Sequence, residues 1–252
     1  MTRGNVSVTP FREGRFSGAC LGVPPSFIFE QTACFDAGKI RLCKQGSKLT
    51  AALTESCFVK NYFYATFLSR FRHLFRRSRA KECFHSALEV LQTGVGTPAP
   101  LGYFRECRNL LPVRDVLFTA ALPEGTRFMP EFFLHDAGQG VRLTAAAVAK
   151  LHAHGIEHGD LSLRTIYLDP EDTPGVIDLD GCRLHGAPLR RKARLREMAR
   201  LISSASKIRA DMGTAEFRKL FLDAYCAECG FDLDCPALDA RIDTLLSHRR
   251  RP

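Results

Sequence analysis

The chain has 252 residues, of which 45% are hydrophobic and 25% are charged, as expected of a globular protein that can bury a full core. No run approaches the roughly 18 apolar residues that a membrane-spanning helix needs, and the first residues lack the apolar stretch of a signal peptide. We therefore expect a cytoplasmic protein, or one that is peripheral on the cytosolic face of a membrane.

The net charge of +9 is concentrated in short basic clusters, chiefly Arg70–Lys81 and Arg190–Arg196. Such clusters attract polyanions, among them nucleic acids, anionic lipid headgroups and phosphorylated substrates, although a solvated helix face has the same appearance. The chain contains no nucleic-acid-binding motif, so we expect an acidic partner other than a specific nucleic acid.

The ten cysteines are scattered, and many lie within apolar runs, which favours reduced and mostly buried thiols in a cytosolic protein. Cys226, Cys229 and Cys235 have a spacing that a zinc site could use. A fourth ligand is not apparent in the sequence, however, so zinc remains the weaker interpretation.

The first half of the chain predicts a small β-rich lobe. Residues 1–36 are rich in Gly, Pro, Ser and Phe and predict an irregular arm with a short strand at 26–30. The pattern then predicts strands at 39–44, 48–53, 56–62, 101–104 and 116–121. Apolar residues from Ala80 to Leu91 recur with helical spacing, and Gly94 follows as a helix stop.

The second half of the chain is predicted to be mostly helical. Thr144 is expected to cap a helix over 145–154, and further helices are expected at about 189–208, 214–228 and 236–248. The fold class is therefore α+β and two-lobed: an arm over 1–36, a β-rich lobe with one helix over 37–122, and a helical lobe over 123–252. A hinge is expected near 122–125.

The most informative segment runs from His158-Gly159-Asp160 to Val176-Ile177-Asp178. A His and an Asp on a short loop precede a β-branched run, a turn, and an apolar run that ends in Asp. Phosphotransfer enzymes use this order: the first aspartate accepts the proton of the substrate hydroxyl, and the second holds magnesium against the ATP phosphates. If Ile166–Leu168 pairs with Val176–Ile177 as a hairpin, both carboxylates could face one site. Each motif is also common by chance, so supporting residues are needed upstream.

Those residues occur in the expected order. Lys60 lies in the apolar run Phe58-Val59-Lys60, where an unpaired ammonium would be costly, and Glu82 lies in the following helix. Pairing with Glu82 and binding of a nucleotide phosphate would account for Lys60, although a half-exposed surface lysine is the simpler explanation of that residue alone. Gly46 lies in a turn whose N–H groups could reach a phosphate, but this turn has a single glycine.

With these residues in place, the chain resembles the bacterial lipopolysaccharide core kinases, which phosphorylate Kdo or heptose sugars. The resemblance runs from about Gly38 to about Gly230. It rests on the segments Phe58-Val59-Lys60-Asn61-Tyr62, Arg77-Ser78-Arg79-Ala80-Lys81-Glu82, Gly94-Val95-Gly96-Thr97-Pro98, His158-Gly159-Asp160-Leu161, Val176-Ile177-Asp178-Leu179-Asp180 and Phe217–Tyr225. The second and third segments are the more specific, because the loop at His158 is shared with aminoglycoside and other small-molecule kinases.

The resemblance implies a protein-kinase-like fold and phosphorylation of a sugar hydroxyl with ATP and Mg²⁺. Lys60 and Glu82 would form the ion pair, Asp160 would be the catalytic base and Asp178 the metal ligand. The acceptor would be an anionic glycolipid or phosphorylated sugar at the inner face of the inner membrane, which would give the basic clusters a function.

One position departs from the family pattern. The loop usually has an asparagine five residues after the catalytic aspartate, where it binds a second magnesium, and here that position is Thr165. A threonine hydroxyl is a poorer metal ligand than an amide carbonyl, so either Asp178 carries most of the metal binding or the activity is reduced. Two alternatives stay open: a kinase-like phosphotransferase that acts on another small molecule or on a protein, and a non-catalytic pseudokinase or scaffold.

Overall fold

A computed structural model describes residues 7–208, 215–230 and 235–247. The chain forms two compact units. The N-terminal unit comprises residues 1–88 and 98–121, and the C-terminal unit comprises residues 89–97 and 122–252.

The N-terminal unit is built on one seven-stranded sheet in which every neighbouring pair is antiparallel. Its strands are β1 (Val8–Glu13), β2 (Phe16–Leu21), β3 (Arg41–Gln45), β4 (Leu49–Leu53), β5 (Phe58–Phe63), β6 (Pro100–Arg108) and β7 (Leu111–Thr119), in the order β1-β2-β6-β7-β5-β4-β3. All five strands predicted between residues 39 and 121 are present, with boundaries shifted by a few residues.

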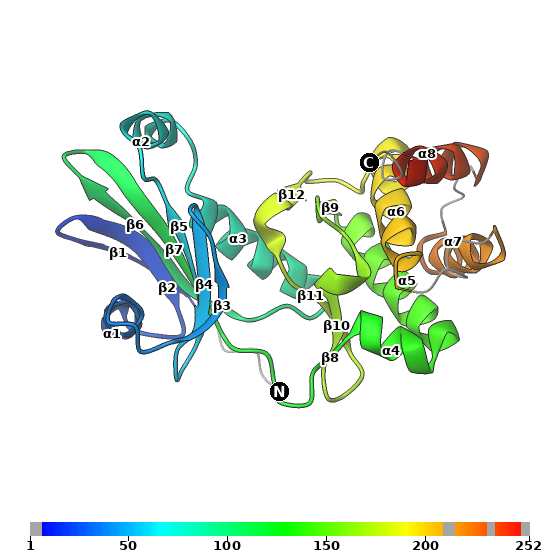
Figure 1. Ribbon diagram of the computed structural model, residues 1–252, viewed down its shortest axis with the longest axis horizontal. Helices are drawn as coiled ribbons and strands as arrows, with labels where there is room; N and C mark the ends of the chain where they lie inside the picture. The colour runs from blue at the N-terminus through cyan, green and yellow to red at the C-terminus, as the bar shows by residue number, and fades with distance from the viewer. Residues whose placement is uncertain (1–6, 209–214, 231–234, 248–252) are drawn as a thin grey trace. The chain divides into compact units, whose positions relative to one another are not determined.

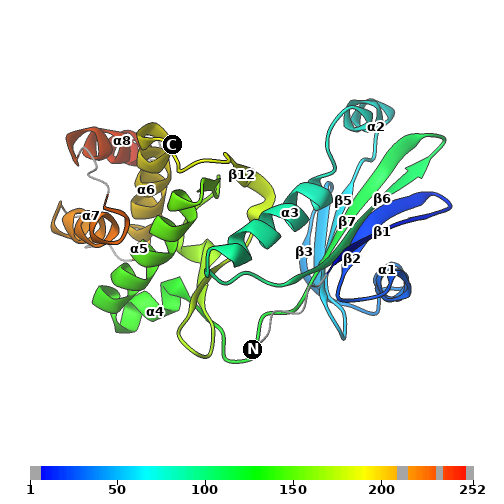
Figure 2. The same cartoon turned by 180° about the vertical axis from the view of Figure 1, so that it is seen from behind.

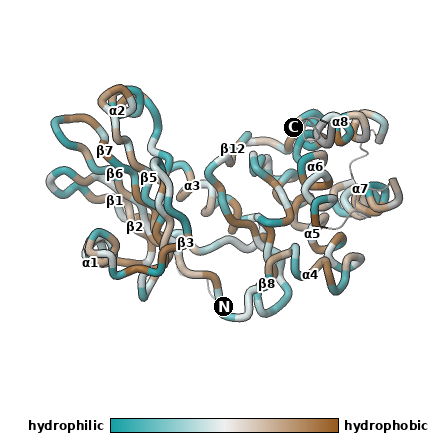
Figure 3. Tube along the Cα trace, in the orientation of Figure 1, coloured by the Kyte–Doolittle hydropathy of each residue, from teal (hydrophilic) through white to brown (hydrophobic). Residues whose placement is uncertain are grey.

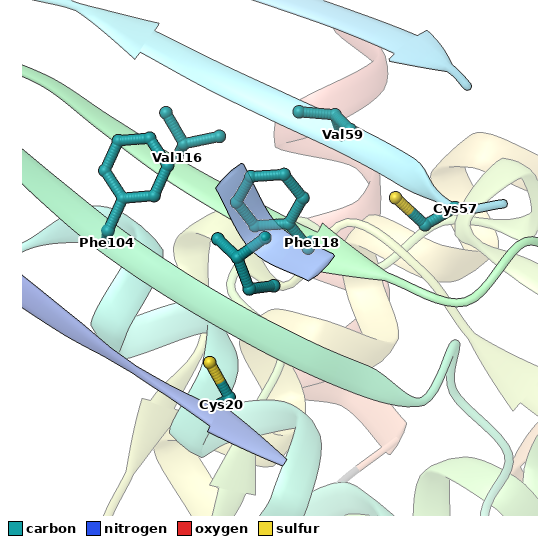
Figure 4. Close-up of a cluster of buried hydrophobic side chains, with 7 residues drawn as sticks. Cys20, Cys57, Val59, Phe104, Val116 and Phe118 are labelled. Carbon is teal, nitrogen blue, oxygen red and sulfur yellow. The ribbon is translucent and has the colours of Figure 1, made fainter. Parts of the chain in front are cut away.

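The two faces of this sheet are covered by different helices, α1 (Pro25–Asp36) and α3 (Arg79–Gln92) (Figures 1 and 2). Side chains alternate between the faces of a strand. Val59 of β5 therefore belongs to the cluster under α1, with Ile28, Phe104 and Phe118 (Figure 4). Tyr62 belongs to the opposite cluster, with Ala80, Cys83 and Phe84 of α3.

The predicted irregular arm is wrong for the residues that the structure describes. Residues 8–21 form the β1–β2 hairpin, and the strand predicted at 26–30 lies inside α1. Pro25 at the first helical position fixes φ for a helix start, and this signal outweighs the local β-propensity. Residues 1–6 of the predicted arm lie outside the described residues. The expectation of one helix in this lobe is also wrong, because α1 and α2 (Phe67–Leu74) accompany α3.

A buried carboxylate fixes the start of α3. Asp115 of β7 is fully buried and accepts hydrogen bonds from Arg105 Nε at 2.8 Å, from the Tyr64 hydroxyl at 2.7 Å and from the Arg79 backbone N–H at 3.0 Å. Ser78 caps the same helix by accepting from the backbone N–H of Lys81 at 3.3 Å. At its other end α3 is followed by Gly94 with φ +77°, which confirms the predicted glycine stop.

The C-terminal unit is mostly helical, as predicted. Its elements are β8 (Arg127–Phe128), α4 (Met129–His135), α5 (Ala137–Ala153), β9 (Ile156–Glu157), β10 (Ile166–Leu168), β11 (Pro174–Val176), β12 (Arg183–Leu184), α6 (Arg191–Ala205), α7 (Ala215–Cys229) and α8 (Cys235–Ser247). Helix α5 packs along α7, and α6 packs along α8. Residue 248, the predicted end of the last helix, lies outside the described residues.

The predicted cap of α5 is wrong. Thr144 is fully buried within the helix, which begins eight residues earlier than predicted, at Ala137. The cap is Asp136, whose side chain accepts from the backbone N–H of Gln139 at 2.8 Å. Within the described parts of the chain, the helices are all too short or too polar to span a bilayer.

Candidate active site

The predicted hairpin of the C-terminal unit is present. Strands β10 and β11 pair antiparallel, with Ile166 opposite Val176. The loop that carries His158 leads into β10, and the segment that carries Asp178 follows β11. Strand pairing therefore brings the two segments to the same end of the hairpin.

Direct contacts join these two segments. The His158 ring nitrogen Nε2 lies 2.9 Å from the backbone carbonyl of Ile177, which accepts a hydrogen bond from the Nε2–H group. Gly159 has φ +84°, and a Cβ at this position would lie 2.1 Å from the Gly181 carbonyl oxygen. Only glycine permits this backbone contact. Asp160, next to Gly159, and Asp178, next to Ile177, are thus held on neighbouring loops.

Both aspartates are accessible. The Asp160 side chain is 76% exposed and lies 3.8 Å from Arg200 Nη1 of α6. Asp178 is exposed and has φ +66°, which places a non-glycine residue in the left-handed region. A strained backbone of this kind persists only where its surroundings fix it, and it is common at functional sites.

Glu197, which was not predicted from the sequence as a functional residue, holds the loop that carries His158 and Asp160. Glu197 of α6 is 2% exposed, and its two carboxylate oxygens accept the backbone N–H groups of His158 and Gly159, each at 2.8 Å. Burial raises the pKa of Glu197, but hydrogen bonds from His152 and from the His158 backbone outweigh it, so its pKa lies below the usual range. The ionised carboxylate therefore fixes the backbone immediately before Asp160.

A chain of buried polar groups supports Glu197. Arg194 Nη1 donates to the Tyr225 hydroxyl at 2.7 Å, and that hydroxyl lies 2.8 Å from Nδ1 of His152. Nε2 of His152 lies 3.4 Å from the Glu197 carboxylate. Burial lowers the pKa of His152, so the ring is neutral at pH 7. The neutral tautomer with the proton on Nε2 satisfies every group, because Tyr225 then donates to Nδ1 and the ring donates to Glu197.

The structure gives Thr165 a role within the loop. Its hydroxyl accepts from the Ser162 backbone N–H at 3.1 Å and donates to the Ser162 carbonyl at 2.9 Å, and the residue is 8% exposed. These bonds close the short helical turn Leu163–Thr165. A role of Thr165 as a metal ligand stays a prediction, and one lone pair of its oxygen remains outside these two bonds.

The other predicted site residues lie in the N-terminal unit. Lys60 is on β5 and shares with Tyr62 the sheet face that α3 covers, while Glu82 is exposed in the first turn of α3. Their pairing stays a prediction. Gly46 lies between β3 and β4, where its backbone N–H donates to the Leu49 carbonyl at 2.9 Å. This turn is therefore closed by its own backbone, and its proposed contact with a phosphate is also untested.

A segment that carries the family resemblance pairs with the hairpin. Gly96 forms a parallel bridge with Gly175 of β11 through two hydrogen bonds: its N–H donates to the Pro174 carbonyl at 3.0 Å, and its carbonyl accepts from the Val176 N–H at 2.8 Å. The Gly-Val-Gly-Thr-Pro segment thus lies beside β11, the strand that leads to Asp178, and pairs with it.

The second basic cluster is only partly available to a partner. Arg194 is 4% exposed and bonds to Tyr225, and Arg196 forms an ion pair with the buried Glu157. The expectation that the Arg190–Arg196 cluster binds an anionic partner stays a prediction, and Arg194 and Arg196 are already engaged within the protein. Arg190, Arg191 and Lys192 are exposed.

The residues present suit magnesium held together with a nucleotide. Among the described residues, no group of three or more His, Cys, Asp or Glu side chains could hold a metal ion by itself. Magnesium commonly binds through one or two carboxylates together with substrate phosphates and water. The exposed carboxylates of Asp178 and Asp180 are hard oxygen donors of this kind.

Comparison with known proteins identifies the family. Residues 68–225 match the model of the Lipopolysaccharide kinase (Kdo/WaaP) family. Because the match covers more than half of the chain, the protein belongs to this family, and the resemblance seen in the sequence is confirmed. The fold is that of the protein-kinase-like neighbours, which confirms the predicted α+β class.

Two curated relatives are 3-deoxy-D-manno-octulosonic acid (Kdo) kinases. The Vibrio parahaemolyticus protein is 26% identical over 115 residues, or 42% of this chain, and a Vibrio vulnificus protein is 24% identical over 100 residues, or 39%. The matched stretches span 45% and 42% of those relatives, less than half of their length.

Two solved structures share the fold. WaaP in complex with acyl carrier protein superposes with a TM-score of 0.65 at 18% identity, covering 90% of this chain and 97% of that one. Glucosamine kinase in complex with glucosamine, ADP and inorganic phosphate superposes with a TM-score of 0.50 at 14% identity, covering 98% and 88%.

Proposed function

We propose that the protein is an ATP-dependent phosphotransferase that phosphorylates a sugar hydroxyl, Kdo or heptose, of the lipopolysaccharide inner core. The observation that carries the proposal is the pair of neighbouring loops with Asp160 and Asp178, held by Glu197 and by the bond from His158 to Ile177. Preorganised carboxylates on such loops are what phosphoryl transfer requires of a protein. Membership of the Kdo/WaaP family supports the choice of substrate class.

In this proposal each residue has one role. Asp160 would accept the proton of the acceptor hydroxyl as that oxygen attacks the γ-phosphorus, and ADP would leave as the bond between the γ-phosphorus and the β–γ bridging oxygen breaks. Asp178 would hold magnesium, and the ion would supply positive charge against the ATP phosphates. Lys60, oriented by Glu82, would contact the nucleotide phosphates, and backbone N–H groups of the Gly46 turn would donate to a phosphate. Thr165 shapes the catalytic loop and offers at most one weak oxygen to the metal.

Arg200 supports an anionic acceptor. Its guanidinium lies 3.8 Å from the Asp160 carboxylate and is 39% exposed, so it could bind a carboxylate or phosphate of the acceptor next to the attacking hydroxyl. An inner-core sugar with such a group would place its hydroxyl at Asp160 and its anionic group at Arg200. The protein would then act at the cytosolic face of the inner membrane, where an anionic glycolipid acceptor would be presented.

The test is an acceptor panel with radiolabelled ATP and magnesium. We expect label in core glycolipids that carry Kdo or heptose, and a higher KM for the acceptor in Arg200→Gln with a smaller change in kcat. Transfer to a different small molecule or to a protein would favour the broader kinase-like alternative. Binding of ATP that is tight and independent of magnesium, without transfer to any acceptor, would favour a non-catalytic scaffold.

A further inference from the structure

Helix α2 lies on the N-terminal unit with its apolar side facing outward. Among the large apolar residues of α2 and its C-cap, the exposed fractions are 72% for Phe67, 58% for Leu68, 46% for Phe71, 42% for Leu74 and 76% for Phe75. No residue of α2 is buried. Figure 3 shows both strongly hydrophobic and strongly hydrophilic residues along this short helix.

Polar contacts fix α2 in this orientation. The His73 ring stacks on the Tyr64 ring, with centroids 3.8 Å apart, and Arg70 Nε donates to the Tyr64 carbonyl at 2.9 Å. Arg105, which is held by Asp115, donates to the carbonyls of His73 and Arg76, each at 3.2 Å. The helix is thus attached to the sheet through its polar side, the reverse of an ordinary amphipathic surface helix.

The outward side is a continuous aromatic surface. At about 100° per residue, the five apolar residues occupy a sector roughly 120° wide, and the rings of Phe67, Phe71 and Phe75 contact one another in sequence. Arg70 and Arg72 lie on the two flanks of this sector. Arg72 is exposed, as are Arg76 and Arg77, which follow the helix.

We propose that α2 is an interfacial anchor that inserts its aromatic side into the headgroup region of an anionic phospholipid bilayer. A short helix with Phe and Leu on one side and arginines on its flanks suits this environment, because the apolar side enters the acyl boundary while the cations meet lipid phosphates. At about 1.5 Å per residue the segment is roughly 13 Å long, so it would lie in the plane of the interface.

A second copy of the chain fits this surface less well. A symmetric dimer through α2 would place the same patch on both partners, so that the arginines around one helix would face those around the other. Negatively charged lipid, in contrast, complements both the aromatic surface and its basic border.

The binding test is flotation with vesicles of phosphatidylcholine alone and of phosphatidylcholine mixed with phosphatidylglycerol, at low and high salt. We expect the parent protein to bind the anionic vesicles more tightly, and salt to weaken this binding. Phe71→Ser should lower the affinity by about tenfold or more, and Arg72→Gln by about fivefold on anionic vesicles.

The matched control is Leu134→Ser, at an exposed leucine of α4 in the other unit, which should bind vesicles like the parent. Equal binding by Phe71→Ser and Leu134→Ser, with both variants folded by circular dichroism, would overturn the proposal. A parent that fails to bind anionic vesicles, and that forms a dimer dissociated by Phe71→Ser, would instead identify α2 as an interface between copies.

The inference rests on the proposed function only in the role it gives to the membrane, and a paired activity assay separates the two. With a deacylated, water-soluble core acceptor, Phe71→Ser should react like the parent. With the acylated form of this acceptor embedded in vesicles, Phe71→Ser should be slower than the parent by about the factor seen in flotation. Vesicle binding without phosphorylation of either acceptor would overturn the proposed function and leave the anchor in place.

Discussion

Replacing Glu197 with glutamine isolates the support of the catalytic loop. The two carboxylate oxygens accept the N–H groups of His158 and Gly159, each at 2.8 Å, in a site where Glu197 is 2% exposed. Glutamine has almost the same shape but offers one acceptor oxygen, so its NH₂ group would face a backbone N–H. One charge-assisted hydrogen bond is therefore lost, which costs about 1.5–3 kcal/mol.

The assay is thermal unfolding followed by circular dichroism. A loss of this size should lower the melting temperature by roughly 3–12 °C. The matched control is Glu228→Gln on the exposed side of α7 in the same unit, which should change stability by less than about 0.5 kcal/mol. If Glu197→Gln and Glu228→Gln had the same melting temperature, the argument that Glu197 holds the loop would be refuted.

Three further predictions follow from the polar contacts. Asp115→Ala should destabilise the protein by about 3–5 kcal/mol in urea unfolding, because it removes the buried acceptor of the half-buried Arg105, of the Tyr64 hydroxyl and of the Arg79 N–H; a loss below 1 kcal/mol would contradict the network. Thr165→Val should lose both bonds to the Ser162 backbone and lower stability by about 1–3 kcal/mol, whereas Thr165→Ser should behave like the parent. Stability should fall on acidification. Because the pKa of His152 is lowered in the folded state, stability falls as the pH drops below the usual pKa of histidine, and because the pKa of Glu197 is also lowered, a further loss follows as the pH falls through the folded-state pKa of Glu197. A melting temperature independent of pH between 7 and 4 would contradict both assignments.

The sequence allowed the strands around Lys60 and the hairpin between Asp160 and Asp178 to be predicted, because their apolar runs and turn residues are local signals. The strands of residues 8–21 were missed, since their sequence, interrupted by Pro10, Gly14 and Gly18, has no clear alternation. Pro25 was a helix-start signal in the sequence, but the aromatic run after it suggested a strand.

The roles of Glu197 and α2 depend on contacts distant in sequence. Glu197 is 39 residues from His158, and no periodicity indicates that its carboxylate meets that backbone. The one feature of the sequence that could have identified Glu197 is that this acidic residue lies within the apolar stripe of a predicted helix. For α2, the sequence shows an amphipathic segment, but the exposed side chains and the polar contacts of the structure are needed to show which side faces outward.

The most direct test of the proposed chemistry is single-turnover phosphotransfer by Asp160→Asn. Asparagine preserves the shape of the exposed side chain but cannot accept the acceptor proton, and Asp178 remains available for magnesium. We predict normal folding, retained Mg-ATP binding, and transfer to the core glycolipid slowed by about 10²–10⁴-fold. Transfer by Asp160→Asn at the rate of the parent would contradict the assignment of Asp160 as the base and, with it, the account of this site.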